Sequence, residues 1–351
     1  MRHSIARSLA IVAVATVAIS IAGCTKAPEA GGTGGEAAAG ADTVKIALVS
    51  GGAHPYFQPW IEAGAQAKTD FGFADVTFNE TAEWDQTKQN DVINSLVANG
   101  YNAFGIFGVS PTDINSTFAN LKKNGIAVGS IASCPAGDTD EADFCLSTDV
   151  ETAAYKAAVA AIEAMDGKGV LAHLTGNNAD SNTQRRIAGV KKAVDETNGA
   201  VTLLPDVTDI DVDLTTAQKA VADLLASQGD TITGMVSTAY NPAVAAATAV
   251  KESGLDIKLV AIDDDETILA AIADGSVYAT VAQNPVGQAY VGSYVLGKLA
   301  TQECTVADPG VVVDSGSFIV TKDNVDSYND ERIAASEELK TTFDSELLDC
   351  K

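Results

Sequence analysis

Short apolar runs alternate with longer amphipathic segments along most of this chain. Segments such as DQTKQNDVINSLVANG and NPAVAAATAVKESG, which space their apolar residues as helices do, separate the runs. Nearly continuous apolar strands separated by helices are typical of parallel sheets covered on both faces. The sequence therefore predicts an α/β fold with doubly wound parallel sheets. The runs are VKIALVS (44–50), DVTFNE (75–80), AFGIFG (103–108), IAVGSIA (126–132), GVLAHLTG (169–176), VTLLPDV (201–207), TGMVST (233–238), KLVAIDD (258–264) and YATVAQ (278–283).

The length of the chain favours two such sheets. About 310 of the 351 residues follow the first 42, which is more than a single hydrophobic core usually serves. A break in the strand and helix order falls near residues 147–149, where a loop flanked by cysteines ends and a new helix begins at Glu151. We therefore expect two lobes of similar construction.

The N-terminal residues have the composition of an export signal. Arg2 and Arg7 precede an apolar run over 9–21, which is too short for a comfortable membrane span and is followed by small residues. Residues 21–24, Ile-Ala-Gly-Cys, resemble the bacterial lipobox, in which the cysteine carries lipid and becomes the mature N-terminus. We expect a lipoprotein signal peptide over 1–23, lipidation at Cys24 and a flexible Gly- and Ala-rich tether over 24–42. The alternative is an ordinary secreted protein.

The acidic composition bears on possible partners. The chain has 22 Lys and Arg residues against 47 Asp and Glu, a formal net charge of −25. Nucleic acid is not an expected partner, because binding it depends on neutralising phosphates with Lys and Arg. An acidic surface suits a soluble exported protein.

The cysteines beyond Cys24 are even in number, as expected of disulfides in an oxidising compartment. They are Cys134, Cys145, Cys304 and Cys350, and four cysteines permit three pairings. Pairing Cys134 with Cys145 would close an acidic loop, and pairing Cys304 with Cys350 would pin the end of the chain.

Few groups suitable for catalysis are present. The sequence motifs of zinc proteases, serine hydrolases and dinucleotide-binding enzymes are missing from suitable places. His173 lies inside an apolar run, where a hydrogen-bonded core residue is expected. Asp209, Asp211 and Asp213 have the spacing of a calcium loop, but the Gly and Glu that such a loop requires are missing, so we interpret them as solvated turn acids. We expect no cofactor, no metal and no enzymatic activity.

Polar and aromatic residues recur where the predicted strands end. In an α/β sheet this edge is where ligands bind. Aromatic rings beside carboxylates and amides suit a small polyhydroxylated ligand, whose C–H faces pack on rings while its hydroxyls need donors and acceptors. These residues are Ser50, His54, Tyr56, Phe57, Asn177, Asn178, Asp180, Ser181, Asn182, Gln184, Tyr240, Asn241, Asp263 and Gln283.

With these residues the chain resembles the type I periplasmic sugar-binding proteins, the ribose-binding-protein-like group that delivers ligands to ABC importers. The segments that carry the resemblance are ALVSGGAHPYF (47–57), KLVAIDD (258–264) and ATVAQNPVGQAYVG (279–292), and the resemblance extends from about Thr43 to Val320. It implies two lobes joined by a hinge, a ligand held between them, and an ABC permease with its ATPase as partners.

The resemblance also assigns roles to individual positions. Tyr56 and Phe57 match the aromatic residues that sandwich the sugar from the first lobe, and His54, after Ser50, matches the polar residue of the first turn. Asp263 matches the acid that accepts hydrogen bonds from ring hydroxyls, and Gln283 matches the amide beside the hinge. Tyr240 falls where the group often has an amide.

Other positions depart from the ribose-binding pattern. Ala132 and Ser133 stand where an Asp-Arg pair is expected, Gln184 aligns with an arginine, and Val212 lies near the position of a second-lobe aromatic. Because Ser and Gln cannot reproduce the bidentate donors of a guanidinium, the ligand is not expected to be bound as ribose is. A differently substituted sugar, a polyol or a less polar small molecule is expected, with Ser133 and Gln184 among its contacts.

The break near residues 147–149 and the resemblance together give the expected division of the chain into lobes. The first lobe covers 43–148 and resumes over about 284–312, and the second covers 149–283 and resumes over about 313–351. The protein is expected to be a monomer, exported and lipid-anchored at the outer face of the cell membrane or in the periplasm. Two alternatives remain: a protein that presents its ligand to a chemotaxis or signalling receptor, and an exported enzyme on the same scaffold.

Overall fold

A computed structural model describes residues 40–81, 83–136 and 140–351. The predicted signal peptide, Cys24 and most of the predicted tether lie outside these residues. Within the described ranges, no helix combines the length and the apolar character needed to cross a membrane.

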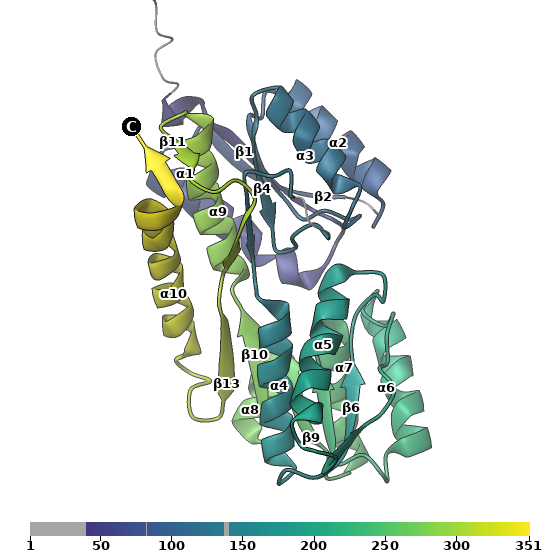
Figure 1. The fold of residues 1–351 in the computed structure, drawn as a ribbon. Coiled ribbons are helices and arrows are strands. Elements are labelled where there is room, and N and C mark those ends of the chain that lie inside the picture. Colours follow the sequence, from purple (N-terminus) through teal and green to yellow (C-terminus); the bar gives the residue numbers. More distant parts are fainter. Residues whose placement is uncertain (1–39, 82, 137–139) are drawn as a thin grey trace, which may run out of the picture. The chain divides into compact units, whose positions relative to one another are not determined.

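The N-terminal half of the chain builds most of a six-stranded sheet whose strands are all parallel (Figure 1). In spatial order the strands are β12 (Val311–Asp314), β5 (Phe144–Ser147), β4 (Ala127–Ile131), β3 (Ala103–Ile106), β1 (Lys45–Ser50) and β2 (Asp75–Glu80). Burial is nearly continuous along β1, β3, β4 and β5, as expected of strands with helices on both faces.

Helices cover both faces of this first sheet. On one face α1 (Pro59–Phe71) and α9 (Pro285–Ala300) pack around the fully buried Trp60. On the other face α2 (Gln86–Ala98) and α3 (Ile114–Lys123) contribute a second apolar cluster. We call this sheet and its helices the first lobe.

A second six-stranded sheet is parallel except at one edge, where β13 (Ser317–Thr321) runs antiparallel to β10 (Ala279–Gln283). The order continues through β9 (Lys258–Ile262), β8 (Gly234–Ser237), β6 (Gly169–Leu174) and β7 (Val201–Leu203). We call this sheet and the helices on its two faces the second lobe. The helices are α4 (Val150–Ala164) and α5 (Ser181–Asp195) on one face and α6 (Leu214–Gln228), α7 (Tyr240–Ser253) and α8 (Glu266–Asp274) on the other.

The predicted α/β class is confirmed, and every apolar run singled out in the sequence contains a strand of one of the two sheets. The runs did not reveal β5, β12 or β13. β12 and β13 lie at sheet edges and are partly exposed, so they lack the continuous apolar character that marks a central strand.

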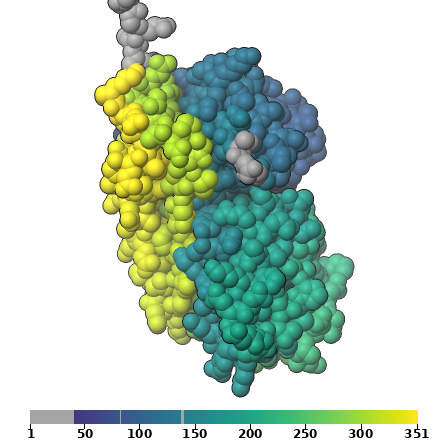
Figure 2. Space-filling model, in the orientation of Figure 1, coloured from purple at the N-terminus to yellow at the C-terminus, as the bar shows by residue number. Residues whose placement is uncertain are grey.

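Three segments carry the chain between the lobes, around 147–150, 283–285 and 314–317. The end of the chain differs from the sequence-based expectation, which placed 313–351 in the second lobe. Helix α10 (Tyr328–Thr342) packs Tyr328 into the second-lobe core, but Leu339 and Phe343 are buried in the core of the first lobe. Figure 2 accordingly shows the C-terminal residues, in yellow, beside both lobes.

Two disulfides are present among the described residues. Cys134 is joined to Cys145, at the start of β5, and Cys304 is joined to Cys350. The second disulfide links β11 (Cys304–Val306) to β14 (Leu348–Cys350), which pair as a small antiparallel sheet. Of the three pairings that the sequence allows, the structure has the one that closes the acidic loop and fixes the chain end to the first lobe.

Candidate functional site

A cavity of about 350 Å³ opens between residues of the two lobes, at the carboxyl ends of the strands. This volume lies within the range of small-molecule sites. The first lobe contributes mostly aromatic and apolar side chains, and the second contributes carboxylates, amides, hydroxyls and a guanidinium.

The first turn of the chain brings the Gly51-Gly52 pair against the indole of Trp84. A Cβ atom at either glycine would lie 2.6 Å from the ring, so only glycine allows the turn and Trp84 to pack this closely. The short helix η2 (Pro55–Phe57) follows, and the side chain of His54 caps it by accepting a hydrogen bond from the backbone N–H of Tyr56 at 3.2 Å. The glycines, the cap and Pro55 together position the aromatic residues of this turn.

Three aromatic rings of the first lobe contact one another beside the cavity. The ring centroids of Phe57 and Phe107 are 5.2 Å apart, and those of Trp84 and Phe107 are 5.9 Å apart. Phe57 is almost fully buried, whereas Trp84 is 47% exposed and its indole therefore lies at the mouth of the cavity. Trp60 packs against Phe57, with ring centroids 5.0 Å apart, and is fully buried in the core of the first lobe.

Polar atoms without partners face the cavity from the start of α5. Thr183 is fully buried and its Oγ1 has no hydrogen-bond partner among the described residues, and the same is true of the buried Nε of Arg186. Asp180 caps the helix by accepting a hydrogen bond from the N–H of Asn182, and burial raises the pKa of its carboxyl. The Thr183 hydroxyl, Nε of Arg186 and the Asp180 carboxyl can therefore form hydrogen bonds with a bound polar molecule.

Asp263 and Gln283 form a buried pair at the ends of β9 and β10. The amide of Gln283 donates to the Asp263 carboxylate at 2.8 Å. Burial raises the pKa of Asp263 to about 7, an effect that the hydrogen bond from Gln283 and the charge of Arg186 oppose. Asp263 has a φ of 63°, a left-handed conformation that an aspartate tolerates better than most residues and that turns the chain sharply after β9. The carboxyl and the amide both line the cavity.

The two tyrosines of the cavity direct their hydroxyls to protein groups. Tyr56 donates to the side chain of Gln288 at 2.8 Å, and Tyr240 donates to Asp265 at 2.8 Å. Burial raises the pKa of both hydroxyls above the ordinary value. Their ring faces and edges, rather than their hydroxyls, are therefore available to a bound molecule.

Residues from the two lobes also meet inside the cavity. Nε2 of His54 lies 3.4 Å from Oδ2 of Asp211. The amide of Asn182 donates to the backbone oxygen of Ala132 at 3.3 Å. Asp211 was interpreted from sequence as a solvated turn acid, and its place in the cavity corrects that interpretation.

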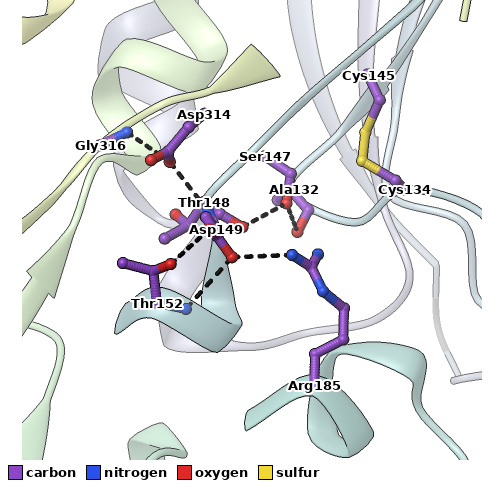
Figure 3. A network of polar contacts seen from close by, with 10 residues as sticks. All are labelled: Ala132, Cys134, Cys145, Ser147, Thr148, Asp149, Thr152, Arg185, Asp314 and Gly316. Atoms are coloured by element: carbon purple, nitrogen blue, oxygen red, sulfur yellow. Dashed lines mark hydrogen bonds and ion pairs between the residues drawn. A yellow bond between two sulfur atoms is a disulfide. The ribbon is translucent and has the colours of Figure 1, made fainter. Parts of the chain in front are cut away.

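Figure 3 shows how polar contacts join the segments that cross between the lobes. Asp314 accepts a hydrogen bond from the N–H of Asp149 at 2.9 Å, and Asp149 is paired with Arg185 of α5 at 2.9 Å. Burial alone would raise the pKa of Asp149, but hydrogen bonds from Thr152 and the charge of Arg185 hold it below its ordinary value. Ser147 Oγ donates to the Ala132 oxygen at 2.9 Å. The crossing segments are thus tied both to one another and to residues beside the cavity.

The predicted site residues fall into two groups. His54, Tyr56, Phe57, Tyr240, Asp263 and Gln283 all line the cavity. Ser50, Ser133 and Gln184 do not: the Ser50 hydroxyl donates to the oxygen of Gly52, and the exposed Gln184 amide donates to Asn178. Arg186, two residues beyond Gln184 on α5, supplies a guanidinium to the cavity.

Sequence reasoning also missed several residues that line the cavity, including Trp84, Phe107, Val109, Thr183, Arg186 and Asp211. Phe107 directly follows β3, so the rule that found Tyr56 and Phe57 could have found it. Trp84 is four residues beyond β2, and its position depends on the packing against Gly51 and Gly52 that only the fold reveals.

His173 is the hydrogen-bonded core residue that its sequence context predicts. The side chain is fully buried, with Nδ1 2.6 Å from Asp206 Oδ1 and Nε2 2.8 Å from Thr238 Oγ1. Thr238 lines the cavity, so its hydrogen bond with His173 fixes the position of a residue in the cavity wall.

A second cavity of about 650 Å³ adjoins the first and shares Tyr56, Tyr240 and Asp263 with it. Its acids already have partners: Asp264 pairs with Arg332 at 2.7 Å, and Asp265 accepts from Tyr240. The smaller cavity is the better candidate for binding, because its unpartnered polar atoms need a ligand. Among the described residues, no group of three or more His, Cys, Asp or Glu side chains could hold a metal ion.

The geometry agrees with comparisons to known proteins. Residues 46–304 match the periplasmic binding protein domain family. The ribose import binding protein of Bacillus subtilis is 26% identical over 223 residues, which are 63% of this chain and 68% of the relative.

Two solved structures have closely similar folds. An ABC transporter solute-binding protein from Burkholderia graminis, in complex with D-arabinose, has a TM-score of 0.72 and 21% identity over 82% of this chain and 98% of that one. A periplasmic solute-binding protein from Actinobacillus succinogenes, with bound D-allose, has a TM-score of 0.74 and 18% identity over 81% of this chain and 100% of that one. The family match covers well over half of the chain, so this protein belongs to the periplasmic binding protein domain family and has the type I fold.

Proposed function

We propose that this protein is the extracytoplasmic solute-binding component of an ABC importer and that it binds a small carbohydrate or polyol in the cavity between its lobes. The observation that carries the proposal is the pairing of aromatic rings with unpartnered buried polar atoms around one cavity. Rings accept the C–H faces of a sugar, and Thr183 and Arg186 need the hydrogen bonds that its hydroxyls supply. The sugars in the solved relatives and the name of the Bacillus relative support the same ligand class.

Thermal unfolding tests the ligand class directly. The purified protein would be scanned against pentoses, hexoses and polyols, each at a concentration well above the expected Kd. A ligand at about 100 times its Kd should stabilise the folded state by roughly 2.7 kcal/mol, which raises Tm by a few degrees. No shift with any member of the panel would refute a carbohydrate or polyol ligand.

The chain offers a matched pair of variants for this test. Arg186→Gln removes the guanidinium that lines the cavity, and Gln184→Ala changes an exposed side chain two residues away that does not line it. The first should abolish the ligand-induced shift, and the second should leave it unchanged. Equal effects of the two would place the ligand outside this cavity.

We also propose that Cys24 is lipidated and anchors the protein to the outer face of the cell membrane, where it serves an ABC permease and its ATPase. The proposal is supported by the apolar run over 9–21 and the Ile-Ala-Gly-Cys sequence that ends it. Cell fractionation of the native chain and of Cys24→Ser tests it, with mass spectrometry of the N-terminal peptide. Recovery of both proteins in the membrane fraction would contradict an anchor at Cys24.

A further inference from the structure

The first lobe gives the cavity an almost entirely apolar wall. Its side chains are those of Phe57, Trp84, Phe107, Val109, Pro111 and Ala132, together with His54 and Tyr56. The hydroxyl of Tyr56 is already bonded to Gln288. Among the described residues of this wall, two side chains therefore present a hydrogen-bonding atom without a hydrogen-bond partner. These atoms are Nε2 of His54, 3.4 Å from Asp211, and the indole N–H of the half-exposed Trp84.

The backbone of the same wall is also occupied by protein partners. Gln89 is fully buried behind it, where its amide donates to the Phe107 oxygen at 2.6 Å and its oxygen accepts from the Val109 N–H at 3.1 Å. The Ala132 oxygen accepts a hydrogen bond from Ser147 at 2.9 Å. A ligand hydroxyl that faces Phe107, Val109 or Ala132 therefore meets carbon atoms and backbone groups that are already bonded.

The opposite wall has the reverse character. Thr183 Oγ1 and Arg186 Nε are buried without a hydrogen-bond partner in the described part of the chain, and carboxylates of Asp180, Asp211 and Asp263 line the cavity beside them. An ionised carboxylate accepts, a protonated carboxyl also donates, and a guanidinium donates, so this wall can satisfy several hydroxyls that both donate and accept. Apart from His54 and the indole N–H of Trp84, the polar groups that can bind a ligand are therefore on the second-lobe side.

From this asymmetry we infer that the ligand is a deoxygenated sugar or polyol, in which a methyl or methylene group replaces one hydroxyl and faces the first-lobe wall. The inference rests on the proposed function and names its ligand class more narrowly. The ring faces of a common pentose or hexose offer C–H groups to aromatic rings, but its edge carries hydroxyls all round. A hydroxyl turned to Phe107 and Val109 would lose its bonds to water without gaining any. A C–H group in the same place packs against Phe107 and Val109 at no such cost.

Matched pairs of sugars that differ by one hydroxyl test this inference. The pairs are L-fucose with L-galactose, L-rhamnose with L-mannose, and 2-deoxy-D-ribose with D-ribose, measured by isothermal titration calorimetry on the purified protein. Burying one unsatisfied hydroxyl weakens binding by roughly 5- to 150-fold, so the deoxy member of at least one pair should bind tighter by a factor in this range. If the parent sugar binds as tightly or tighter in every pair that binds, the inference is wrong while the proposed function stands. If no member of any pair binds, the inference fails, and the wider panel of common sugars and polyols decides the proposed function separately.

Two variants test whether the apolar first-lobe wall causes the preference for the deoxy sugar. Val109→Thr places a hydroxyl on the apolar wall with little change of volume, and should reduce the preference for the deoxy sugar by at least about fivefold. Thr183→Val removes a hydroxyl from the opposite wall and should weaken both members of the pair alike, which leaves their ratio unchanged. A ratio that changes with Thr183→Val but not with Val109→Thr would overturn the assignment of the apolar wall. Circular dichroism and Tm confirm that both variants are folded.

Discussion

His54 and Asp211 meet across the cavity from opposite lobes, with Nε2 of the imidazole 3.4 Å from Oδ2 of the carboxylate. Nδ1 of the ring accepts a hydrogen bond from Tyr56, which places the proton of the neutral ring on Nε2, facing Asp211. Asp211 is fixed in turn, because its Oδ1 accepts from the N–H of Asn241 at 2.8 Å. A polar pair therefore joins the lobes at the site where the ligand is proposed to bind.

The substitution Asp211→Asn removes the negative charge opposite His54. The asparagine keeps a side-chain oxygen that can accept the hydrogen bond from the N–H of Asn241, at the start of α7. We expect the free energy of unfolding to change by less than about 1 kcal/mol, because the pair is partly exposed. Ligand affinity should fall roughly 5- to 30-fold through the loss of charge-assisted hydrogen bonds. Titration calorimetry and urea unfolding measure the two effects.

Asp209 provides the control for this variant. It lies on the same loop, accepts a hydrogen bond from Asn178 and does not line the cavity. Asp209→Asn should bind ligand as the native protein does. If it weakens binding as much as Asp211→Asn, the loop and not the Asp211 carboxylate is responsible.

The two tryptophans give an optical test of the ligand position. Trp84 lines the cavity and is 47% exposed, whereas Trp60 is fully buried in the first-lobe core. A ligand that enters the cavity removes water from the indole of Trp84, so we expect intrinsic fluorescence to change on binding. Trp84→Phe should abolish the change in a fluorescence titration, and Trp60→Phe should retain it. A signal that persists without Trp84 would argue for binding elsewhere.

The stability of the ligand-free protein is expected to depend on pH through the carboxyl of Asp263. Burial raises its pKa to about 7 in the folded state, whereas an aspartate in an unfolded chain titrates near about 3.9. Between these values the folded state holds a proton that the unfolded state has lost, so this contribution to stability falls as pH rises from about 4 to about 7 and then stays constant. The full difference is on the order of 4 kcal/mol.

Asp263→Asn should remove this dependence. The amide cannot titrate, and it can still accept a hydrogen bond from Gln283. Relative to the native protein, the variant should therefore gain stability between pH 5 and pH 8, as measured by urea unfolding at the two pH values. A stability difference that is the same at both would show that the Asp263 carboxyl is ionised throughout this range.

The fold was readily predicted because its signals are local. Each central strand of a parallel sheet is buried on both faces and reads as an apolar run, as β1 does from Lys45 to Ser50. Asp263 directly follows β9 and His54 lies in the turn that leads from β1 to the next helix, so both were expected at the ligand-binding edge, and both line the cavity. The edge strands β12 and β13 carry no comparable signal, and the return of the chain end to the first lobe was not predicted.

The rest of the site depends on contacts between segments far apart in the sequence. Trp84 reaches the cavity because Gly51 and Gly52 leave room for its ring. Asp211 follows an irregular segment after β7, and only its distance to His54 distinguishes it from the turn acid Asp209. Arg186 lies one turn into α5, where the direction of a helix face decides whether a guanidinium points into the cavity. A single sequence contains no measure of these distances.

The disulfides are expected to contribute unequally to stability. Cys134 and Cys145 are 11 residues apart, and Cys304 and Cys350 are 46 apart. If a disulfide acts mainly by restricting the unfolded chain, the shorter loop contributes about 3 kcal/mol and the longer about 4 kcal/mol. The longer one also holds β14, whose Leu348 is buried in the first-lobe core.

Serine variants of each pair, studied by urea unfolding, test this order. The Cys304→Ser, Cys350→Ser protein should lose more stability than the Cys134→Ser, Cys145→Ser protein. Without its disulfide, β14 is held by a short antiparallel pairing with β11 and by the buried Leu348, so the end of the chain should also exchange its amide hydrogens faster. A larger loss from the Cys134–Cys145 pair would mean that strain or packing at the start of β5 outweighs the restriction of the unfolded chain.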